Sequence, residues 1–176
     1  MAVKILIVDD DDEIRKVLRV LLRQTGYELL EARDAETAFG LLREQAAHVG
    51  AVICDVRLPR VSGIGILERM TQEYKTLPVI VLTAMAELSV AVEAMKKGAF
   101  DFLAKPAKKD ELILAIEKAL NHKSLLDSYV ALQEQHERDR RNFEHRLDEK
   151  TRALEEALAQ LRQTREELTK LNAPHQ

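Results

Sequence analysis

The sequence predicts an α/β fold in which helices cover both faces of a doubly wound parallel sheet. Short apolar runs, partly β-branched, alternate five times with longer runs whose apolar residues recur at helical spacing, within about the first 120 residues. Gly26 and Gly98 follow two of the expected helices, where a glycine commonly ends a helix. Alternating strands and helices form parallel sheets with right-handed crossovers, which leaves few possible topologies.

The expected strands are the short apolar runs at residues 3–8, 27–30, 51–54, 78–82 and 100–103. Two of the intervening helices have a clear apolar face. The residues of the first face are Ile14, Val17, Leu18, Leu21 and Leu22, and those of the second are Ala35, Ala38, Phe39 and Leu42.

Composition excludes several classes of protein. The net charge of −3 argues against binding nucleic acid through a basic surface. No run approaches the length needed to cross a bilayer, and the N-terminal run does not resemble a signal peptide, so we expect a cytoplasmic protein without membrane segments. Cys54, the single cysteine, lies in an apolar run, and we expect a buried and unreactive thiol.

Polar residues stand directly after four of the five expected strands: Asp9, Asp10, Asp11, Asp12, Asp55, Thr83 and Lys105. In such sheets ligands bind beyond the carboxyl ends of the strands, so these side chains converge on one edge. Carboxylates this close repel one another unless a cation neutralises them. Oxygen ligands without histidine or thiolate suit Mg²⁺. The pattern therefore predicts a magnesium-dependent phosphoryl-transfer site with a carboxylate nucleophile.

Each part of this pattern also has a purely structural interpretation. The acidic run can simply cap a helix, Thr83 can cap the next one, and Lys105-Pro106 can be a turn. Their joint placement at the ends of four different strands favours a functional site.

The residues around these positions resemble the full signature of response-regulator receiver domains. The matching segments are residues 5–10, 53–59, 62–63, 81–84 and 105–106, in the expected order. The resemblance implies a flavodoxin-like (βα)5 fold with strand order 2-1-3-4-5 over residues 1–120.

The resemblance also implies a role for each residue. Asp55 accepts a phosphoryl group from a histidine kinase or phosphotransfer protein, so the chain is a phosphorelay acceptor and not an ordinary enzyme. Mg²⁺ is bound by Asp10, Asp55 and the backbone carbonyl of Arg57, with Asp9 acting through water.

The remaining implied roles concern the switch. Lys105 pairs with Asp55 at rest and with the phosphoryl group afterwards, and Thr83 donates its hydroxyl to that group. Phe102 occupies the position of the aromatic residue that reports the movement in many receivers, although packing in a core explains a phenylalanine there equally well.

The last third of the chain has a different pattern. Residues 107–173 contain neither glycine nor proline, and Leu147, Leu154, Leu161 and Leu168 recur every seven residues. We expect a helix over residues 121–172, about 78 Å long, continuing the last receiver helix and pairing as a parallel dimeric coiled coil. We expect residues 173–176 to form a disordered end.

Two heptad frames are possible for this helix. With the four leucines at position a, Leu126, Gln133 and Arg140 join the a set. The d set is then Tyr129, His136, Phe143, Lys150, Ala157, Thr164 and Leu171. The alternative frame, with the leucines at d, gains Val130 and Leu158 but loses Tyr129, Phe143 and Leu171.

Two functions compete. The first is a phosphorelay switch whose dimeric stalk passes the signal to an effector. The second is a constitutive coiled-coil scaffold with a receiver fold, and the complete acidic, hydroxyl and lysine set favours the first. A leucine-zipper DNA binder is disfavoured, because Asp139 and Glu144 interrupt the basic stretch that begins at Arg138. Residues 122–176 also hold ten Lys/Arg against eleven Asp/Glu, which is the balance of a solvated helix. A haloacid-dehalogenase phosphatase would use Asp9 and Asp11 but leaves Asp55 unexplained.

Overall fold

The structure is a computed structural model that describes residues 2–58, 62–84 and 88–171. Its contacts group the chain into two compact units, one that runs to Ser128 and one that begins at Tyr129. The expected end at residues 173–176 lies outside the described residues. Among the described helices, none is long and apolar enough to span a membrane.

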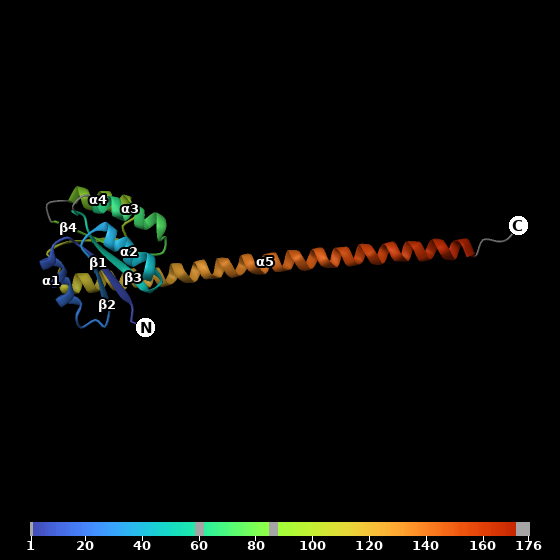
Figure 1. Ribbon diagram of the computed structural model, residues 1–176, viewed down its shortest axis with the longest axis horizontal. Coiled ribbons are helices and arrows are strands. Elements are labelled where there is room, and N and C mark those ends of the chain that lie inside the picture. Colours follow the sequence, from blue (N-terminus) through green and yellow to red (C-terminus); the bar gives the residue numbers. More distant parts are fainter. Residues whose placement is uncertain (1, 59–61, 85–87, 172–176) are drawn as a thin grey trace. The chain divides into compact units, whose positions relative to one another are not determined.

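The first unit is built on a parallel sheet of five strands (Figure 1). The strand order is β2-β1-β3-β4-β5, which confirms the flavodoxin-like prediction. The strands are β1 (Lys4–Val8), β2 (Glu28–Ala32), β3 (Val49–Asp55), β4 (Val79–Ala84) and β5 (Asp101–Lys105). The expected strands differ from these bounds by a few residues, because short apolar runs mark the buried part of a strand and not its ends.

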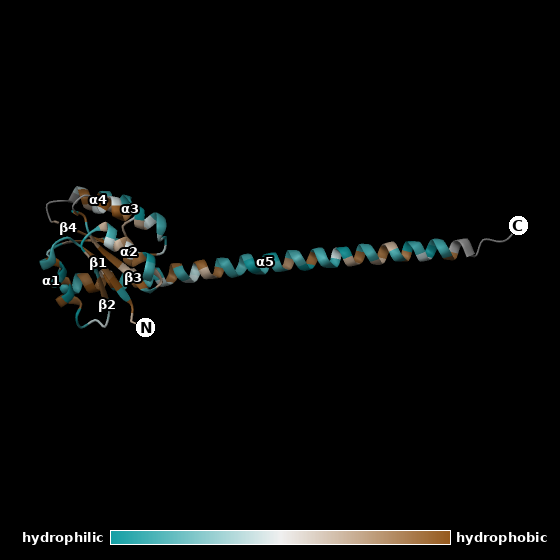
Figure 2. Cartoon of the chain, in the orientation of Figure 1, coloured by the Kyte–Doolittle hydropathy of each residue, from teal (hydrophilic) through white to brown (hydrophobic). Residues whose placement is uncertain are grey.

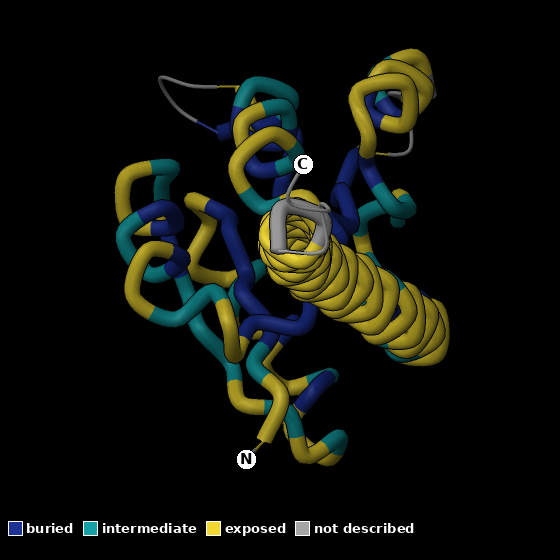
Figure 3. The backbone as a smooth tube through the Cα atoms, turned by 90° about the vertical axis from the view of Figure 1, so that its right-hand side faces the viewer, coloured by how far each residue is buried: buried dark blue, intermediate teal, exposed yellow. Residues whose placement is uncertain are grey.

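Helices cover both faces of the sheet. The helical elements are α1 (Asp12–Leu22), α2 (Ala35–Gln45), the 3-10 turn η1 (Ala46–His48), α3 (Gly63–Glu73), α4 (Leu88–Lys96) and α5 (Lys109–Leu171). Alternate side chains of β1 point to opposite faces. Leu6 and Val8 pack with residues of α2, α3 and α4, whereas Ile5 and Ile7 pack with residues of α1 and α5. The central strands β1, β3 and β4 are largely buried, whereas the edge strands β2 and β5 are partly exposed. Figure 2 shows the hydropathy along the chain, and Figure 3 shows its burial.

The predicted helix faces and stops are largely confirmed. Ala38, Phe39 and Leu42 of α2 are buried, as are Leu18 and Leu22 of α1. Val17, which shares this apolar face in the sequence, is 49% exposed. Val20, which lies beside this face, is 71% exposed as well. Only part of the apolar surface of α1 is therefore packed against the rest of the domain. Gly98, with a φ of 97°, follows the end of α4 as the sequence predicted. Gly26 also has a positive φ, of 77°, but α1 already ends at Leu22, so this glycine lies in the turn toward β2 and does not itself end the helix.

The first unit includes more of α5 than the residues that cover the sheet. Leu112, Ala115, Ile116 and Ala119 pack on the sheet. Beyond them, the rings of His122 and Phe100 lie 5.1 Å apart, centroid to centroid. Leu126 lines a cavity of about 250 Å³ together with both of these rings. The contacts of the first unit therefore continue past residue 120, where the sequence placed the domain boundary.

Asp127 gives this part of α5 a polar attachment. Its carboxylate accepts hydrogen bonds from Lys123, at 2.7 Å, and from Thr76 just before β4. Burial alone raises the pKa of Asp127, but these hydrogen bonds and the charge of Lys123 outweigh it and lower the pKa. The ionised carboxylate of Asp127 thus stabilises the fold at any pH above the pKa that this residue has in the unfolded chain. This contribution is lost as the pH falls through the lower pKa that Asp127 has in the folded chain.

Replacing Asp127 by Asn is therefore expected to loosen the attachment at neutral pH. We expect amide hydrogen exchange near residues 122–127 to rise a few-fold, since a partly exposed ion pair contributes less than about 1 kcal/mol. In the wild type the same rise should develop only as the pH falls below about 4. Asp148→Asn, on an exposed part of α5, is the matched control. Unchanged exchange in Asp127→Asn would show that the apolar contacts alone hold these turns.

Candidate functional site

The buried polar residues of the described chain gather at the carboxyl edge of the sheet. Asp9 follows β1, Asp55 ends β3 and Thr83 lies near the end of β4, and all three are buried. Lys105 ends β5. The register explains the convergence, because Val8 pairs with Cys54, Asp55 with Leu82 and Ala84 with Lys105. The sequence-based prediction of one shared edge therefore agrees with the structure.

Lys105 joins two of the carboxylates. Its Nζ lies 2.7 Å from Oδ2 of Asp9 and 2.8 Å from Oδ2 of Asp55. Burial lowers the pKa of Lys105, but its hydrogen bonds to Asp55 and Asp9 outweigh this and raise the pKa. The ammonium therefore stays charged. Pairing with Asp55 was expected from the sequence, whereas the equally short contact with Asp9 was not.

The site has more negative charge than Lys105 can balance. One carboxylate oxygen from each of Asp9, Asp10 and Asp55 lies within 4.8 Å of the others. Burial raises the pKa of Asp9, and the charge of Asp55 adds to this, against the lowering effect of Lys105. Asp10 is exposed, so the group opens to solvent on one side. Three oxygen ligands with surplus negative charge and access to water fit a hard divalent cation such as Mg²⁺.

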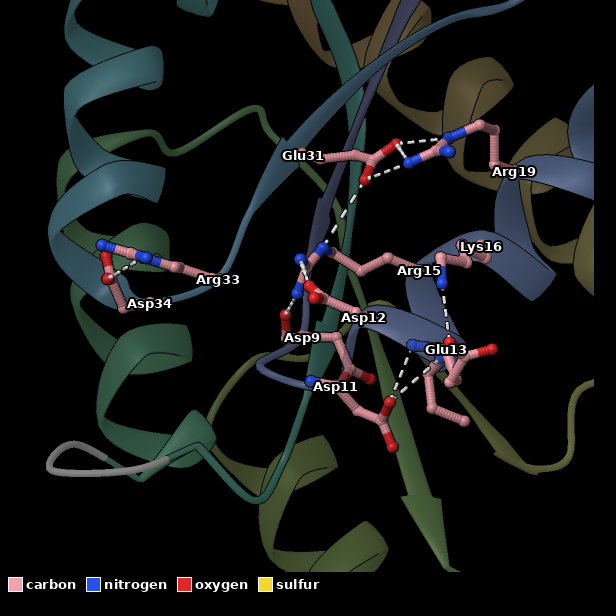
Figure 4. A network of polar contacts seen from close by, with 11 residues as sticks. Asp9, Asp11, Asp12, Glu13, Arg15, Lys16, Arg19, Glu31, Arg33 and Asp34 are labelled. Atoms are coloured by element: carbon pink, nitrogen blue, oxygen red, sulfur yellow. Dashed lines mark hydrogen bonds and ion pairs between the residues drawn. The ribbon is translucent and has the colours of Figure 1, made fainter.

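The loop after β1 is held by its own helix (Figure 4). Asp11 caps α1, and its amide donates to Oδ1 of Asp9 at 2.9 Å. Nη1 of Arg15 donates to the backbone carbonyl of Asp9 at 2.6 Å, while the same guanidinium pairs with Asp12 and Glu31. These contacts fix the acidic loop at both ends. The sequence analysis did not predict a role for Arg15. Its spacing of three residues from Asp12 is typical of an ion pair on one helix face and could have indicated this contact.

The loop after β3 is held by backbone contacts. The amide of Arg57 donates to Oδ1 of Asp55 at 3.1 Å. The amide of Val56 donates to the carbonyl of Leu82, at 3.1 Å, and its carbonyl accepts from Gly63 at 2.8 Å. A Cβ at Gly63 would lie 2.1 Å from the carbonyl oxygen of Asp55. The close approach of α3 to the end of β3 thus requires glycine at position 63. The sequence analysis did not predict this role.

The remaining predicted residues surround this centre. Thr83 is buried and its hydroxyl lies 3.5 Å from the carbonyl oxygen of Ala84. Phe102 is 38% exposed, so its ring does not lie in the core. Cys54 is buried beside the site, and burial together with the charges of Asp55 and Asp9 raises the pKa of its thiol to about 12. The expected burial of this thiol is therefore confirmed, and its raised pKa is in line with the low reactivity predicted for it.

The first unit is thus a doubly wound α/β domain with a buried aspartate paired to a lysine at the carboxyl edge of its sheet. The family model for the response regulator receiver domain matches residues 5–117. The chain belongs to this family and contains the receiver domain of a two-component response regulator.

Individual relatives agree with this assignment. The chain is 39% identical to the regulatory protein AtoC of Escherichia coli K12 over 69% of this chain, and 38% identical to the transcriptional regulatory protein ZraR of the same organism over 72%. The matches span only 26% and 28% of those relatives.

Solved structures are similar as well. A response regulator receiver domain protein from Clostridium thermocellum has a TM-score of 0.67 at 35% identity. The matched region covers 70% of this chain and 98% of the chain from Clostridium thermocellum. NtrX from Brucella abortus has a TM-score of 0.69 at 34% identity, covering 75% of this chain and 30% of its own.

Proposed function

We propose that the chain is a phosphorelay switch in which Asp55 accepts a phosphoryl group. The observation that carries this proposal is the placement of Asp55, with one oxygen bound to Lys105 and the other hydrogen-bonded to the amide of Arg57. Both donors orient the carboxylate at the open edge of the sheet beside Asp10. Such an oriented carboxylate, buried beside an exposed neighbour, is suited to attack phosphorus.

The transfer step is a displacement at phosphorus. A carboxylate oxygen of Asp55 forms a bond to the phosphorus of a phosphohistidine, and the bond between phosphorus and the histidine nitrogen breaks, so the imidazole leaves. The donor is a histidine kinase or phosphotransfer protein. A Mg²⁺ ion, when bound, would neutralise phosphoryl oxygens next to Asp9, Asp10 and Asp55, with the carbonyl of Arg57 as a further proposed ligand.

The phosphoryl group then changes the partners of the surrounding side chains. Lys105, bound to Asp55 and Asp9 at rest, gains a dianion as a stronger partner. Among the residues that the structure describes, the hydroxyl of Thr83 has only a long contact, to the carbonyl of Ala84, so it can turn to a phosphoryl oxygen at little cost. Phe102, on the neighbouring strand β5, would follow this change by turning inward.

Output is proposed to run through the long helix. The distal part of α5 exposes large apolar side chains at heptad spacing, including Leu147, Leu154 and Leu161. In isolation such a stripe is unfavourable in water, and a parallel homodimer would bury it. We propose that phosphorylation alters the packing of this coiled coil and that a downstream effector domain or protein responds. The cytoplasmic location and the absence of nucleic-acid binding stay predictions.

The deciding experiment is the intact mass of the chain after incubation with a small phosphodonor and Mg²⁺. We expect the wild type to gain one phosphoryl group and Asp55→Ala to gain none. Asp101→Ala, which removes an aspartate at the start of β5, should still gain the group. If the wild type gained nothing although it bound Mg²⁺, the constitutive coiled-coil scaffold would be the better account.

A further inference from the structure

The distal helix exposes its large apolar side chains in two series. In the first, Leu125 is 70% exposed and Leu132, seven residues on, is 64% exposed, while Tyr129 and Phe143 are exposed between and beyond them. In the second, Leu147, Leu154, Leu161 and Leu168 are exposed at steps of seven. The first series has the three–four spacing of a coiled-coil seam, and the second has its seven-residue repeat.

The two series are out of phase with each other. The first places its seam at Leu125, Tyr129, Leu132, His136, Asp139 and Phe143, in alternating steps of four and three. A further step of four leads from Phe143 to Leu147, where a step of three would continue the repeat. Eleven residues therefore separate His136 from Leu147 over three turns, or about 3.67 residues per turn, which locally unwinds a left-handed coil.

A single frame through the whole helix needs different residues before Leu147. It places Leu126, Gln133 and Arg140 at the seam. Leu126 is half-buried in the wall of the cavity beside Phe100, so it packs on the receiver and not on a partner helix. The guanidinium of Arg140 pairs with Glu137 at 3.1 Å and with Glu144 at 4.0 Å. These contacts favour a seam that passes through Leu125 and Leu132 instead.

The occupant that fits this stripe is a second copy of the chain in parallel orientation. Positions flanking the seam would meet across a parallel homodimer in pairs five residues apart. These pairs combine no like charges: Ser128 with Gln133, Gln135 with Arg140, Arg146 with Thr151, Ala153 with Leu158 and Gln160 with Arg165. A homodimer thus buries the apolar seam, and its flanking pairs bring no like charges together. Within the seam itself, Asp139 in the first block and Lys150 in the second would each face their own copy.

We infer that the stalk is a parallel homodimer made of two heptad blocks, joined by a four-residue phase shift between Phe143 and Leu147. The inference rests on the proposed dimer and adds its interface. The first block takes its phase from the turns of α5 attached to the receiver through His122, Leu126 and Asp127. The second takes its phase from its own leucines. If the first block rotates about the helix axis, the unwound segment between Phe143 and Leu147 can change its twist, or it can transmit the rotation to the second block.

Disulfide trapping in the full-length chain tests the seam directly. Leu132→Cys and Gln133→Cys differ by one position, and only a seam residue brings its two Cα atoms within the roughly 4.4–6.8 Å that a disulfide requires. Leu154→Cys lies on the seam in every frame and serves as the positive control. The wild type is the blank, because Cys54 is buried. Oxidation is carried out with and without phosphodonor and Mg²⁺.

We expect Leu132→Cys and Leu154→Cys to form covalent dimers at least about tenfold faster than Gln133→Cys, in whichever state dimerises. Faster trapping of Gln133→Cys would establish a single uninterrupted frame and overturn the inference, while leaving the dimer intact. Trapping at Leu154→Cys but at neither other position would also overturn it. If no variant were trapped and light scattering gave a monomer in both states, the proposed dimer itself would fail.

Discussion

Gly63→Ala is expected to lower the free energy of unfolding by about 3 kcal/mol and to displace Asp55 from its present position. An added Cβ would lie 2.1 Å from the carbonyl oxygen of Asp55 and 2.6 Å from Cα of Val56. Both are backbone atoms, so neither can rotate away, and relief requires α3 to move off the end of β3. Forced overpacking of this kind commonly costs about 1–3 kcal/mol, and backbone contacts place it at the upper end.

Chemical denaturation measures this effect, and Gly40→Ala provides the matched control. Gly40 lies inside α2, and a Cβ there would meet no atom within 4 Å. The control should therefore gain about 0.5–1 kcal/mol from the better helix propensity of alanine. Phosphoryl uptake should fall in Gly63→Ala and remain in Gly40→Ala. Equal stabilities of the two variants would contradict the close approach of α3 to β3.

Lys105→Met is expected to destabilise the chain by about 3 kcal/mol in a buffer without divalent cations. Methionine keeps much of the apolar stem but removes the ammonium that bridges Asp9 and Asp55 at 2.7 and 2.8 Å. The two buried carboxylates would then face each other and the nearby Asp10 without a compensating charge. Breaking a buried ion pair on one side is costly because the remaining charge stays desolvated.

Added Mg²⁺ should restore much of this loss, since it would supply positive charge to the same oxygens. Thermal unfolding with and without Mg²⁺ measures both effects. Lys97→Met removes a 2.6 Å ion pair with Glu68 in which both side chains are well exposed. We expect little change in that control, with or without Mg²⁺. A Lys105→Met variant as stable as Lys97→Met would mean that a proton or water already balances the acidic group.

Much of the candidate site could be predicted because the sequence records where each strand ends. Asp9, Asp55, Thr83 and Lys105 each follow or end an apolar run, and parallel strands bring those ends to one edge. The apolar alternation predicted the sheet for the same local reason. The end of α4 at Gly98 could be predicted as well, because a residue with positive φ favours glycine.

Other features depended on distances between residues far apart in the chain. The bond between Lys105 and Asp9 joins residues 96 positions apart, and neither residue type indicates it. Val17 belongs to an apolar stripe in sequence but lies outside the packed stripe of α1, since neighbouring elements decide which part of a helix is covered.

The long helix shows the same division. The seven-residue recurrence of leucines was plain in the sequence, because it is a property of one helix alone. The sequence did not show which leucine faces the receiver. Only the structure distinguishes the two candidates, because Leu126 lines the cavity beside Phe100 whereas Leu125 is exposed. The sequence by itself thus determined the elements and their chemistry, since both follow from local periodicity and strand ends. Tertiary packing decided which of several equivalent side chains each surface uses.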